Sequence, residues 1–282
     1  MAGEVALREL APAKINLCLC VGPPRADGLH ELLSVTASIT LCDELECSDA
    51  ECDETLCPGV EGPNLVSAAL AAFRAETGWD GPPQRISILK RIPVQAGMGG
   101  GSADAAAALR LLARRSGLGD GAVLHAVAAT LGSDVPSQLR PGRAIVRGAG
   151  ELVSALADPD PFGVLVLPSA DGGLSTAEVY READRLGIGR TTAELAALDP
   201  QAMTGVNDLA AATLSLQPSV ARALSRASEA GASHAMVCGS GPTVIGLFDD
   251  PGEAARAAAA LRSAGVDARA ARPFPRAGAL PP

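Results

Sequence analysis

Aromatic residues are scarce in this chain of 282 residues. Phe, Trp and Tyr together make up 2% of the sequence, and Trp79 and Tyr180 are single residues of their kind. Hydrophobic residues nevertheless account for 48% of the chain, so Ala, Leu and Val must fill most of the core. With 20% charged residues, this is the composition of an ordinary globular protein, and the length predicts roughly two domains.

The seven cysteines include no Cys-x-x-Cys pair. Zinc and iron–sulfur sites usually contain such a pair, and an odd number of cysteines fits reduced thiols better than a disulfide framework. We therefore expect no metal site. The regularly spaced series Cys42, Cys47, Cys52 and Cys57 is best explained as strand and loop thiols, and a redox or metal module built on it is the weakest hypothesis.

Positive charge is also in deficit, with 23 Lys and Arg against 32 Asp and Glu and a net charge of −9. This balance argues against general binding to nucleic acid or to anionic membranes. The sequence has neither a secretory signal region nor an apolar run of 18 residues. We expect a cytoplasmic monomer or homodimer with small-molecule partners and with no nucleic-acid or membrane partner.

The most informative stretch is a glycine run that leads into an alanine-rich segment. Gly97, Gly99, Gly100 and Gly101 are four glycines in five positions, which allow positive φ and a close approach of the backbone to a ligand. Strong helix formers follow Ser102. A glycine loop at a helix N-terminus presents unpaired N–H groups and partial positive charge to an anion. The stretch therefore predicts a phosphate site.

The helix behind the loop is expected to have one apolar face, formed by Ala105, Ala106, Leu109, Leu112 and Ala113. Asp104 is expected in its first turn, where it would either favour the helix dipole or help to order Mg²⁺. Two other glycine motifs are excluded. A Walker loop needs a Lys after its glycines, and the dinucleotide fingerprint needs a Gly where Ser102 stands.

Apolar patterning and turn residues predict the remaining elements. The expected strands are 5–10 and 13–21 (separated at Pro12), 32–47, 84–91, 143–148, 163–167, 234–238 and 243–248. The expected helices are 64–77 with Asn64 as N-cap, 120–131 with Asp120 as cap, 176–186, 192–198, 207–214, 218–230 and 251–264, with a short strand after the last. Loops are expected over 48–63 and 158–163, and a loose tail is expected from Arg272.

Asp134 is expected on a short turn between two elements. Gly132 suits the position just after a helix, and Pro136 disfavours helical continuation through Val135. Functional side chains often lie on such turns.

Three motifs, in this order, resemble those of the GHMP kinases: Ala11–Leu17, Pro93–Ala103 and Cys238–Thr243. Shorter signatures resemble the subfamily that acts on a cytidine-diphosphate-linked methylerythritol in non-mevalonate isoprenoid synthesis, namely Arg25–His30, Leu131–Pro136 and Asp171–Tyr180. The resemblance spans about residues 10 to 265 and keeps both the order and the spacing of the motifs.

The resemblance implies an α+β, two-domain GHMP kinase fold. The N-terminal ATP-binding domain (1–157) would resemble domain 2 of ribosomal protein S5. The C-terminal substrate-side domain (158–282) would be ferredoxin-like, with the active site in the cleft between them. The implied activity is ATP-dependent phosphorylation of the 2-hydroxyl of the methylerythritol substrate, with ATP and Mg²⁺ as cofactors.

Lys14 and Asp134 match the family's catalytic residues. Phosphoryl transfer needs in-line positioning and charge stabilisation more than covalent help. Asp134 would accept the proton of the attacking hydroxyl, and Lys14 would keep Asp134 ionised and stabilise the charge on the moving phosphoryl group.

The resemblance also implies the binding residues. ATP would be held by the loop residues Pro93, Val94, Gln95, Ala96, Gly97, Met98, Gly99, Gly100, Gly101, Ser102 and Ala103, with Asn64 near the adenine. The N-cap role explains Asn64 equally well. The substrate would be held by Asn16, His30, Thr176, Tyr180, Gly239, Ser240 and Gly241. Alternation places Asn16 on the same strand face as Lys14.

One residue departs from the family pattern. Leu29 stands where many members carry an aromatic residue before the histidine. A cytosine would then stack on Tyr180 with an aliphatic residue, rather than a second ring, opposite. Two other hypotheses remain open: a sister kinase acting on mevalonate derivatives, homoserine or a sugar, and a non-catalytic nucleotide-binding homologue.

Overall fold

The computed structural model describes residues 6–275. Within this range the chain forms two compact units that interleave in sequence. The first contains the segment up to Ala13, Leu41–Ile92 and Gly99–Arg140, and the second contains Lys14–Thr40, Pro93–Met98 and the chain from Pro141 onward. The units follow packing rather than sequence order, and the domain boundary after residue 157 stays a prediction.

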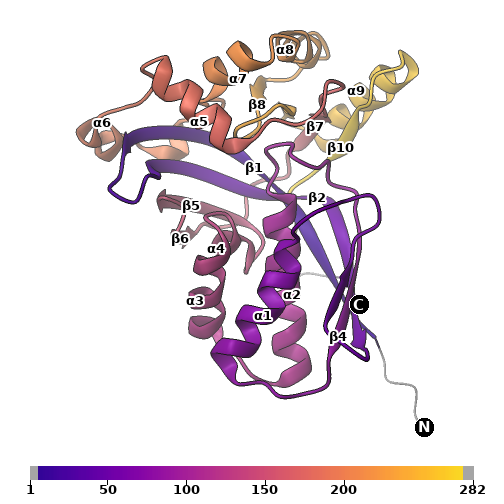
Figure 1. Ribbon diagram of the computed structural model, residues 1–282. Helices are drawn as coiled ribbons and strands as arrows, with labels where there is room; N and C mark the ends of the chain where they lie inside the picture. Colours follow the sequence, from indigo (N-terminus) through magenta and orange to yellow (C-terminus); the bar gives the residue numbers. More distant parts are fainter. Residues whose placement is uncertain (1–5, 276–282) are drawn as a thin grey trace. The chain divides into compact units, whose positions relative to one another are not determined.

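Strands β1 (Leu7–Pro24) and β2 (His30–Asp49) each contribute residues to both units (Figure 1). The expected break at Pro12 is wrong, because β1 continues through it. Within its sheet β1 pairs only with β2, and a strand with a single partner tolerates the missing N–H of a proline.

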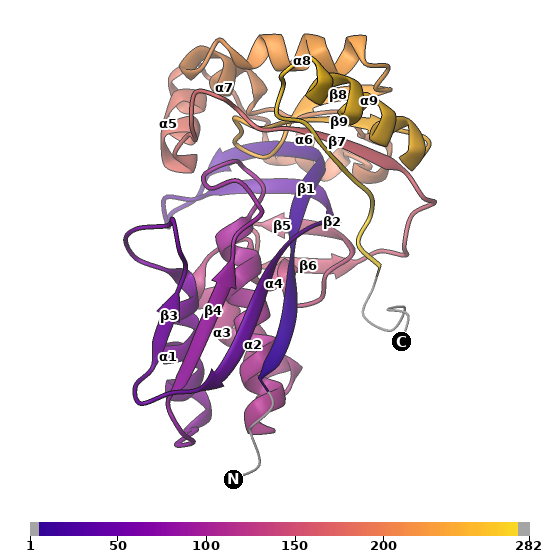
Figure 2. The same cartoon turned by 90° about the vertical axis from the view of Figure 1, so that its right-hand side faces the viewer.

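In the first unit, β3 (Glu54–Leu56) and β4 (Gln84–Leu89) extend the second half of β2 into a sheet (Figure 2). Ile86 lies opposite Thr55 in the parallel β3–β4 pair and opposite Cys47 in the antiparallel β2–β4 pair. Strand β3 lies in a segment expected to be a loop, since its surroundings are rich in Asp, Glu, Gly and Pro, which are depleted in strands.

The helices of the first unit are α1 (Leu65–Thr77), α2 (Gly100–Ser116), α3 (Gly121–Leu131) and the short α4 (Val135–Gln138). Both predicted N-caps are confirmed. Asn64 Oδ1 accepts from the N–H of Val66 at 2.9 Å, and Asp120 Oδ1 accepts from two amides of the first turn of α3.

Helix α2 is buried more completely than a helix with one apolar face. Every residue from Ala103 to Leu109 is buried. The alanines leave room for close neighbours, because a methyl group is the smallest apolar side chain. Residues of the same core come from α1, α3 and the sheet: Leu45, Cys47, Val66, Ala69, Leu70, Phe73, Ile86, Ile88, Val127 and Ala128.

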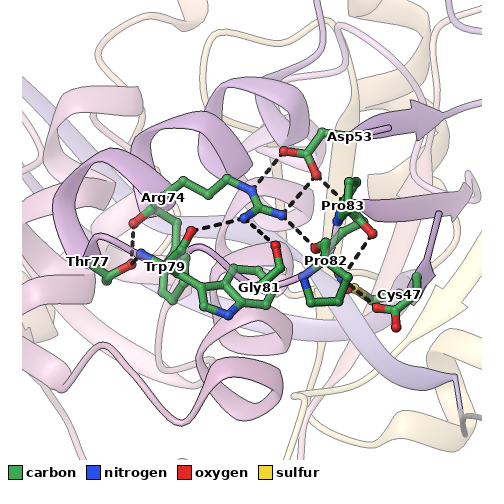
Figure 3. A network of polar contacts seen from close by, with 11 residues as sticks. Cys47, Asp53, Arg74, Thr77, Trp79, Gly81, Pro82 and Pro83 are labelled. Carbon is green, nitrogen blue, oxygen red and sulfur yellow. Dashed lines mark hydrogen bonds and ion pairs between the residues drawn. The ribbon is translucent and has the colours of Figure 1, made fainter. Parts of the chain in front are cut away.

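A polar network around Arg74, which we call the Arg74 brace, secures the end of α1 (Figure 3). Arg74 donates through Nε and Nη2 to the carboxylate of Asp53, at 2.8 and 3.1 Å. Its Nη1 and Nη2 also donate to the backbone oxygens of Trp79, Gly81 and Pro82 at 2.8–3.0 Å. All five N–H groups of the guanidinium are thus used within the protein.

In the second unit, the first half of β2 pairs with β5 (Arg143–Gly148), and β5 pairs with β6 (Leu152–Ala155), both antiparallel. Val35 lies opposite Ile145. Strand β6 was not predicted, and three of its four residues are exposed, so it lacks the burial pattern on which the prediction of strands depends.

The end of the chain forms a four-stranded antiparallel sheet in the order β10-β7-β9-β8. Chain order and strand order together give the ferredoxin-like βαββαβ arrangement. Its elements are β7 (Gly163–Leu167), α8 (Val220–Glu229), β8 (His234–Val237), β9 (Val244–Phe248), α9 (Pro251–Ser263) and β10 (Arg269–Ala271). Both helices contribute to the core of this sheet. The predicted α+β fold with a ferredoxin-like part is confirmed.

Three further helices and a short 3₁₀ turn lie between β7 and α8: α5 (Thr176–Arg185), α6 (Thr192–Ala197), η1 (Pro200–Ala202) and α7 (Ala210–Leu216). Helix α7 begins three residues later than expected. Asn207 is instead in the preceding loop, where its Oδ1 accepts from the N–H of Leu209 at 2.9 Å.

The expected loose tail is wrong for its first residues. The N–H of Thr40 donates to Arg272 O at 2.9 Å, and the N–H of Phe274 donates to Ser38 O at 2.8 Å. The last seven residues of the expected tail, 276–282, lie outside the described residues. Between residues 6 and 275, no helix combines the length and the apolar character needed to cross a lipid bilayer.

Candidate active site

Lys14 and Asn16 lie on one face of β1, as alternation predicts. Lys14 Nζ donates to Asn16 Oδ1 at 2.9 Å. Asn16 Nδ2 donates in turn to Ser34 Oγ of β2 at 2.8 Å. All three residues are buried, with relative exposures of 7%, 4% and 2%. The amide of Asn16 therefore presents its oxygen to the lysine and its nitrogen to the serine.

The first part of the glycine loop is hydrogen-bonded to this strand. The backbone N–H of Lys14 donates to Met98 O at 3.0 Å. Gly97 has φ +73°, and a Cβ there would lie 2.1 Å from Cys238 O and 2.7 Å from the nitrogen of Gly241. Only glycine fits this position, because no Cβ can approach backbone atoms so closely.

The turn after β8, which we call the Gly239 turn, packs against the glycine loop in the same close way. Gly239 has φ +56°, and a Cβ on it would lie 2.6 Å from Gly97 O and 3.4 Å from Lys14 Nζ. Segments of all three family-like motifs therefore meet inside the second unit. The first and third motifs are more than two hundred residues apart in the sequence.

Two residues that the sequence analysis missed fix the carbonyl groups of this turn. Asn207 Nδ2 donates to Val237 O and to Gly239 O, both at 2.8 Å, and Thr213 Oγ1 donates to Ser240 O at 3.1 Å. The N–H groups of Gly239 and Ser240 make no hydrogen bond to another described residue. Neighbouring backbone N–H groups left in this way suit an anion.

The segment Asp171–Tyr180 reaches both the loop and the turn. Leu174 N donates to Gln95 O at 3.3 Å, and Gly173 packs so closely on Gln95 that a Cβ would lie 2.3 Å from its side chain. The hydroxyls of Thr176 and Ser240 are 3.1 Å apart. Of the predicted substrate residues, Thr176, Gly239, Ser240 and Gly241 are thus brought together with Asn16.

The second part of the glycine loop opens helix α2 as predicted. Gly99 occupies the N-cap position with φ +63°, and no side chain caps the first turn. A Cβ on Gly101 would have one neighbour within 4 Å, the Leu65 side chain at 3.7 Å. Uncapped first-turn N–H groups favour an anion; phosphate binding here stays a prediction.

Asp104 is not in the first turn of α2, where it was expected, because the helix begins at Gly100. It is buried and joined to a second acid through one lysine. Lys90 Nζ lies 2.5 Å from Asp43 Oδ2 and 2.8 Å from Asp104 Oδ2, while Asp104 Oδ1 has no hydrogen-bond partner among the described residues. Burial raises the pKa of Asp104 to about 7, and the charge of Lys90 partly opposes this.

Asp134 is the residue before α4, on the short connection after α3, as predicted. Its carboxylate does not cap α4, and Arg110 Nη1 secures that helix by donating to Gln138 O at 2.7 Å. Gly132 does follow α3, but with φ 155° and ψ 159° rather than the expected left-handed helical conformation. Asp134 belongs to the first unit and Lys14 to the second, and their pairing stays a prediction.

His30 and Tyr180, the two residues assigned to the cytosine, are in contact. Their ring centroids are 5.1 Å apart with a tilt of 36°. His30 Nε2 also lies 2.8 Å from Asp184 Oδ1, a partner that the sequence analysis missed. A base stacked between two rings needs about 7 Å between them, so cytosine does not fit between His30 and Tyr180. Leu29, the residue before His30 in the sequence, is 51% exposed.

Two of the four regularly spaced thiols are deeply buried. Burial raises the pKa of Cys42 to about 12 and that of Cys47 to about 11, so both stay protonated and unreactive at neutral pH. Cys57 is partly buried, which also raises its pKa, and Cys52 is exposed.

Comparison with known proteins identifies the family. The model of the GHMP kinases N terminal domain matches residues 64–142, and that of the GHMP kinases C terminal domain matches residues 189–267. The 4-diphosphocytidyl-2-C-methyl-D-erythritol kinase of Salinispora arenicola is 42% identical over 298 residues, covering 96% of this chain and 93% of that protein. The enzyme of that name from Anaeromyxobacter sp. (strain Fw109-5) is 40% identical, covering 93% and 88%.

A crystal structure of 4-(cytidine 5'-diphospho)-2C-methyl-D-erythritol kinase matches with a TM-score of 0.78 and 34% identity, over 95% of this chain and all of that chain. Sequence and structure thus agree over nearly the whole length. The chain therefore belongs to the GHMP kinase family and is an ATP-dependent kinase.

Proposed function

We propose that this kinase phosphorylates the 2-hydroxyl of 4-diphosphocytidyl-2-C-methyl-D-erythritol with ATP, a step of non-mevalonate isoprenoid synthesis. The names of relatives at about 40% identity over most of the chain support this substrate. The observation that carries the proposal is the meeting of three motif segments around Lys14, in which the glycine loop, β1 and the Gly239 turn pack backbone against backbone.

In the proposed reaction Asp134 accepts the proton of the substrate hydroxyl while the hydroxyl oxygen attacks the γ-phosphorus of ATP. The bond between the γ-phosphorus and the β–γ bridging oxygen breaks, and ADP leaves with the electron pair. Lys14 stabilises the negative charge on the transferred group. Support for the role of Lys14 comes from its burial and from its hydrogen bond to a neutral amide. A neutral acceptor orients the ammonium without cancelling its charge.

The loop from Pro93 to Ala103 is proposed to hold the ATP phosphates. The uncapped first turn of α2 supplies N–H groups and the positive end of the helix dipole. Magnesium is proposed to accompany ATP. No group of three His, Cys, Asp or Glu side chains suited to a metal ion occurs among residues 6–275, so we expect phosphate oxygens and water to be its main ligands.

The Gly239 turn is proposed to bind the diphosphate or the acceptor end of the substrate through the N–H groups of Gly239 and Ser240, with the Thr176 hydroxyl beside them. The cytosine is proposed to stack on the side of Tyr180 that does not face His30. His30, which pairs with Asp184 and contacts the other face of Tyr180, is proposed to hold that ring in place for the base.

A coupled assay of ADP release with a panel of alcohols tests the substrate. We expect activity on 4-diphosphocytidyl-2-C-methyl-D-erythritol and none on mevalonate, homoserine or galactose. Activity on one of the other alcohols alone would replace this substrate by that of a sister kinase. If the purified protein binds Mg²⁺-ATP and no alcohol gives ADP, the non-catalytic hypothesis is correct.

Replacing Asp134 by Asn tests the proposed base. The variant should bind both substrates and lose about 10²–10⁴-fold in kcat. Asp120→Asn is the matched control, because Asn is as good an N-cap as Asp and Asp120 only caps α3. Near-wild-type turnover by the Asp134 variant would remove this residue from the mechanism.

We place the reaction in the cytoplasm. The supporting observation is that all seven cysteines, each of them among the described residues, are free thiols, as suits a reducing compartment. Whether the enzyme is a monomer or a homodimer stays a prediction, and sedimentation at micromolar concentration distinguishes the two.

A further inference from the structure

The hydrogen bonds from Lys14 continue beyond Asn16 and end on the backbone. Ser34 Oγ, which accepts from Asn16 Nδ2, itself donates to Cys18 O at 2.5 Å. The four residues are buried and belong to the second unit. We call Lys14, Asn16, Ser34 and the Cys18 carbonyl the lysine relay.

Each of the three hydrogen bonds in the lysine relay can run in only one direction from donor to acceptor. The lysine ammonium has only donors and the Cys18 carbonyl is only an acceptor. The single hydroxyl proton of Ser34 is used on Cys18 O, so a lone pair of Ser34 must face Asn16. That lone pair accepts a hydrogen bond from Asn16 Nδ2. Asn16 Oδ1 then faces Lys14 and accepts a hydrogen bond from its ammonium group.

The Ser34 hydroxyl thereby selects one of the two orientations of the Asn16 amide. In the other orientation the amide nitrogen would face the lysine ammonium, donor against donor, and the amide oxygen would face Ser34. With Ser34 present only the first orientation satisfies every buried group. Without its hydroxyl, Asn16 Nδ2 and Cys18 O both lose a partner.

We propose that Ser34 is a positioning residue of the phosphoryl transfer, which fixes the Lys14 ammonium through the orientation of Asn16. This rests on the proposed catalytic role of Lys14. Ser34 reaches Lys14 through Asn16, so we expect its main effect on the chemical step, with a smaller effect on the KM for the alcohol. Asn16, proposed above as a substrate residue, is at the same time the link between Ser34 and the lysine.

Two variants of equal shape isolate the hydroxyl. Ser34→Thr keeps it, and Ser34→Val replaces it by a methyl group, so any overpacking is common to both. We expect Ser34→Val to lower kcat by about 10- to 100-fold, the scale of a small misplacement of a catalytic group. The KM for ATP should stay within about twofold, and the KM for the alcohol should rise by less than kcat falls. Ser34→Thr should restore kcat to within about threefold.

Ser38 provides the control in the same strand. It is equally buried, and its Oγ accepts from the N–H of Gly142 at 3.1 Å, but it is not part of the lysine relay. Ser38→Val should lower the melting temperature without lowering kcat. Ser34→Ala, which removes only an oxygen atom, replaces Ser34→Val if the valine does not fold, and it should give the same loss of kcat.

Lys14→Met distinguishes a failure of the role proposed for Ser34 from a failure of the role proposed for Lys14. Loss of kcat in Lys14→Met together with equal kcat values for Ser34→Val and Ser34→Thr would refute the role of Ser34 and leave the proposed function intact. A fall in kcat for Ser38→Val as large as that for Ser34→Val would refute it as well. Full activity of Lys14→Met would overturn the proposed role of the lysine itself, and the role of Ser34 with it.

Discussion

The Arg74 brace and the lysine relay are both hydrogen-bond networks around one cation, the first partly exposed and the second buried, and they use the cation differently. Arg74 has a carboxylate partner in Asp53, and its five N–H groups donate to protein oxygens. The guanidinium carbon also lies 4.5 Å from the centre of the Trp79 ring. Two of the six aromatic residues of the chain, Phe73 and Trp79, pack edge to face at 6.0 Å at this brace.

In the lysine relay the cation donates to a neutral amide, that of Asn16, and the last acceptor is a backbone carbonyl. The geometry of Lys14 is fixed while its charge is not cancelled by that partner. The comparison suggests a general distinction: a network that neutralises and saturates its cation serves stability, whereas one that orients a cation through neutral groups serves chemistry. Lys14→Met and Arg74→Met test it.

The largest expected effect is that of Lys14→Met. The substitution removes the positive charge and keeps an apolar stem of similar length. We expect kcat to fall by about 10²–10³-fold, as for the loss of one preorganised donor, with a melting temperature within a few degrees of the wild type. If the variant melts far lower and the folded protein keeps its full kcat, the lysine relay serves stability, as the Arg74 brace does.

Arg74→Met should show the opposite pattern. It removes the donor of Trp79 O and Gly81 O, while the N–H of Gln84 still donates to Asp53 Oδ1 and Gln84 Nε2 still donates to Pro82 O. We expect this to cost about 1–3 kcal/mol of stability and roughly 2–12 °C in melting temperature. The kcat of the folded protein should not change. Arg85→Met is the control, because its pair with Glu54 is half exposed and such pairs contribute at most about 1 kcal/mol.

The buried carboxyl group of Asp104 provides a pH test. Its pKa is raised from 3.8 to about 7 by burial, so between these values the folded protein holds a proton that the unfolded chain has released. The contribution of Asp104 to stability therefore falls as pH rises from 4 to 7, by up to about 1.4 kcal/mol per pH unit. Asp104→Asn should lack this slope in denaturation curves at pH 5, 6 and 7, and parallel curves for the two proteins would contradict the prediction.

Asn64 has two possible roles, and two variants separate them. Asn64→Ala removes the cap of α1 and should cost about 1 kcal/mol of stability. Asn64→Asp keeps an equally good cap but loses the amide N–H₂. If Asn64 also contacts adenine, both variants raise the KM for ATP, by about 2- to 10-fold for one hydrogen bond; this is the result we expect. A normal KM for Asn64→Asp would restrict the residue to capping.

The smallest expected effect is that of Leu29→Tyr. It adds a ring at an exposed position beside His30, where it should stack on the cytosine. We expect the KM for the cytidine substrate to fall roughly two- to fivefold, the range of one aromatic contact, while the KM for ATP stays constant. No change in either constant would mean that the base does not pass close to residue 29.

The sequence predicted the features that depend on neighbouring residues alone, such as helix caps and the start of α2. Asn64 and Asp120 are the caps that their positions next to apolar, helix-forming segments predict, and the glycine loop does open a helix. Strand β3 and the pairing of Arg272 and Phe274 with β2 were missed. Both depend on partners distant in the sequence, which composition and periodicity do not reveal.

The same limit applies to the site. Lys14 and Gly97 were identified through motifs, but Ser34, Asn207 and Thr213 carry no motif and act by hydrogen bonds across the fold. The one available signal was Asn207 at the expected start of a helix, since Asn is a common capping residue. Which carbonyl groups it would hold is fixed only by the ferredoxin-like part closing around it.

The interleaving of the two units has a consequence for how the protein is made. The first unit needs nothing beyond Arg140, so it can complete its core once the ribosome has released that residue. Lys14–Thr40, synthesised earlier, must wait for β5, β6 and the C-terminal sheet. A truncated gene product ending near residue 157 would therefore carry Lys14 without the Gly239 turn that packs against it.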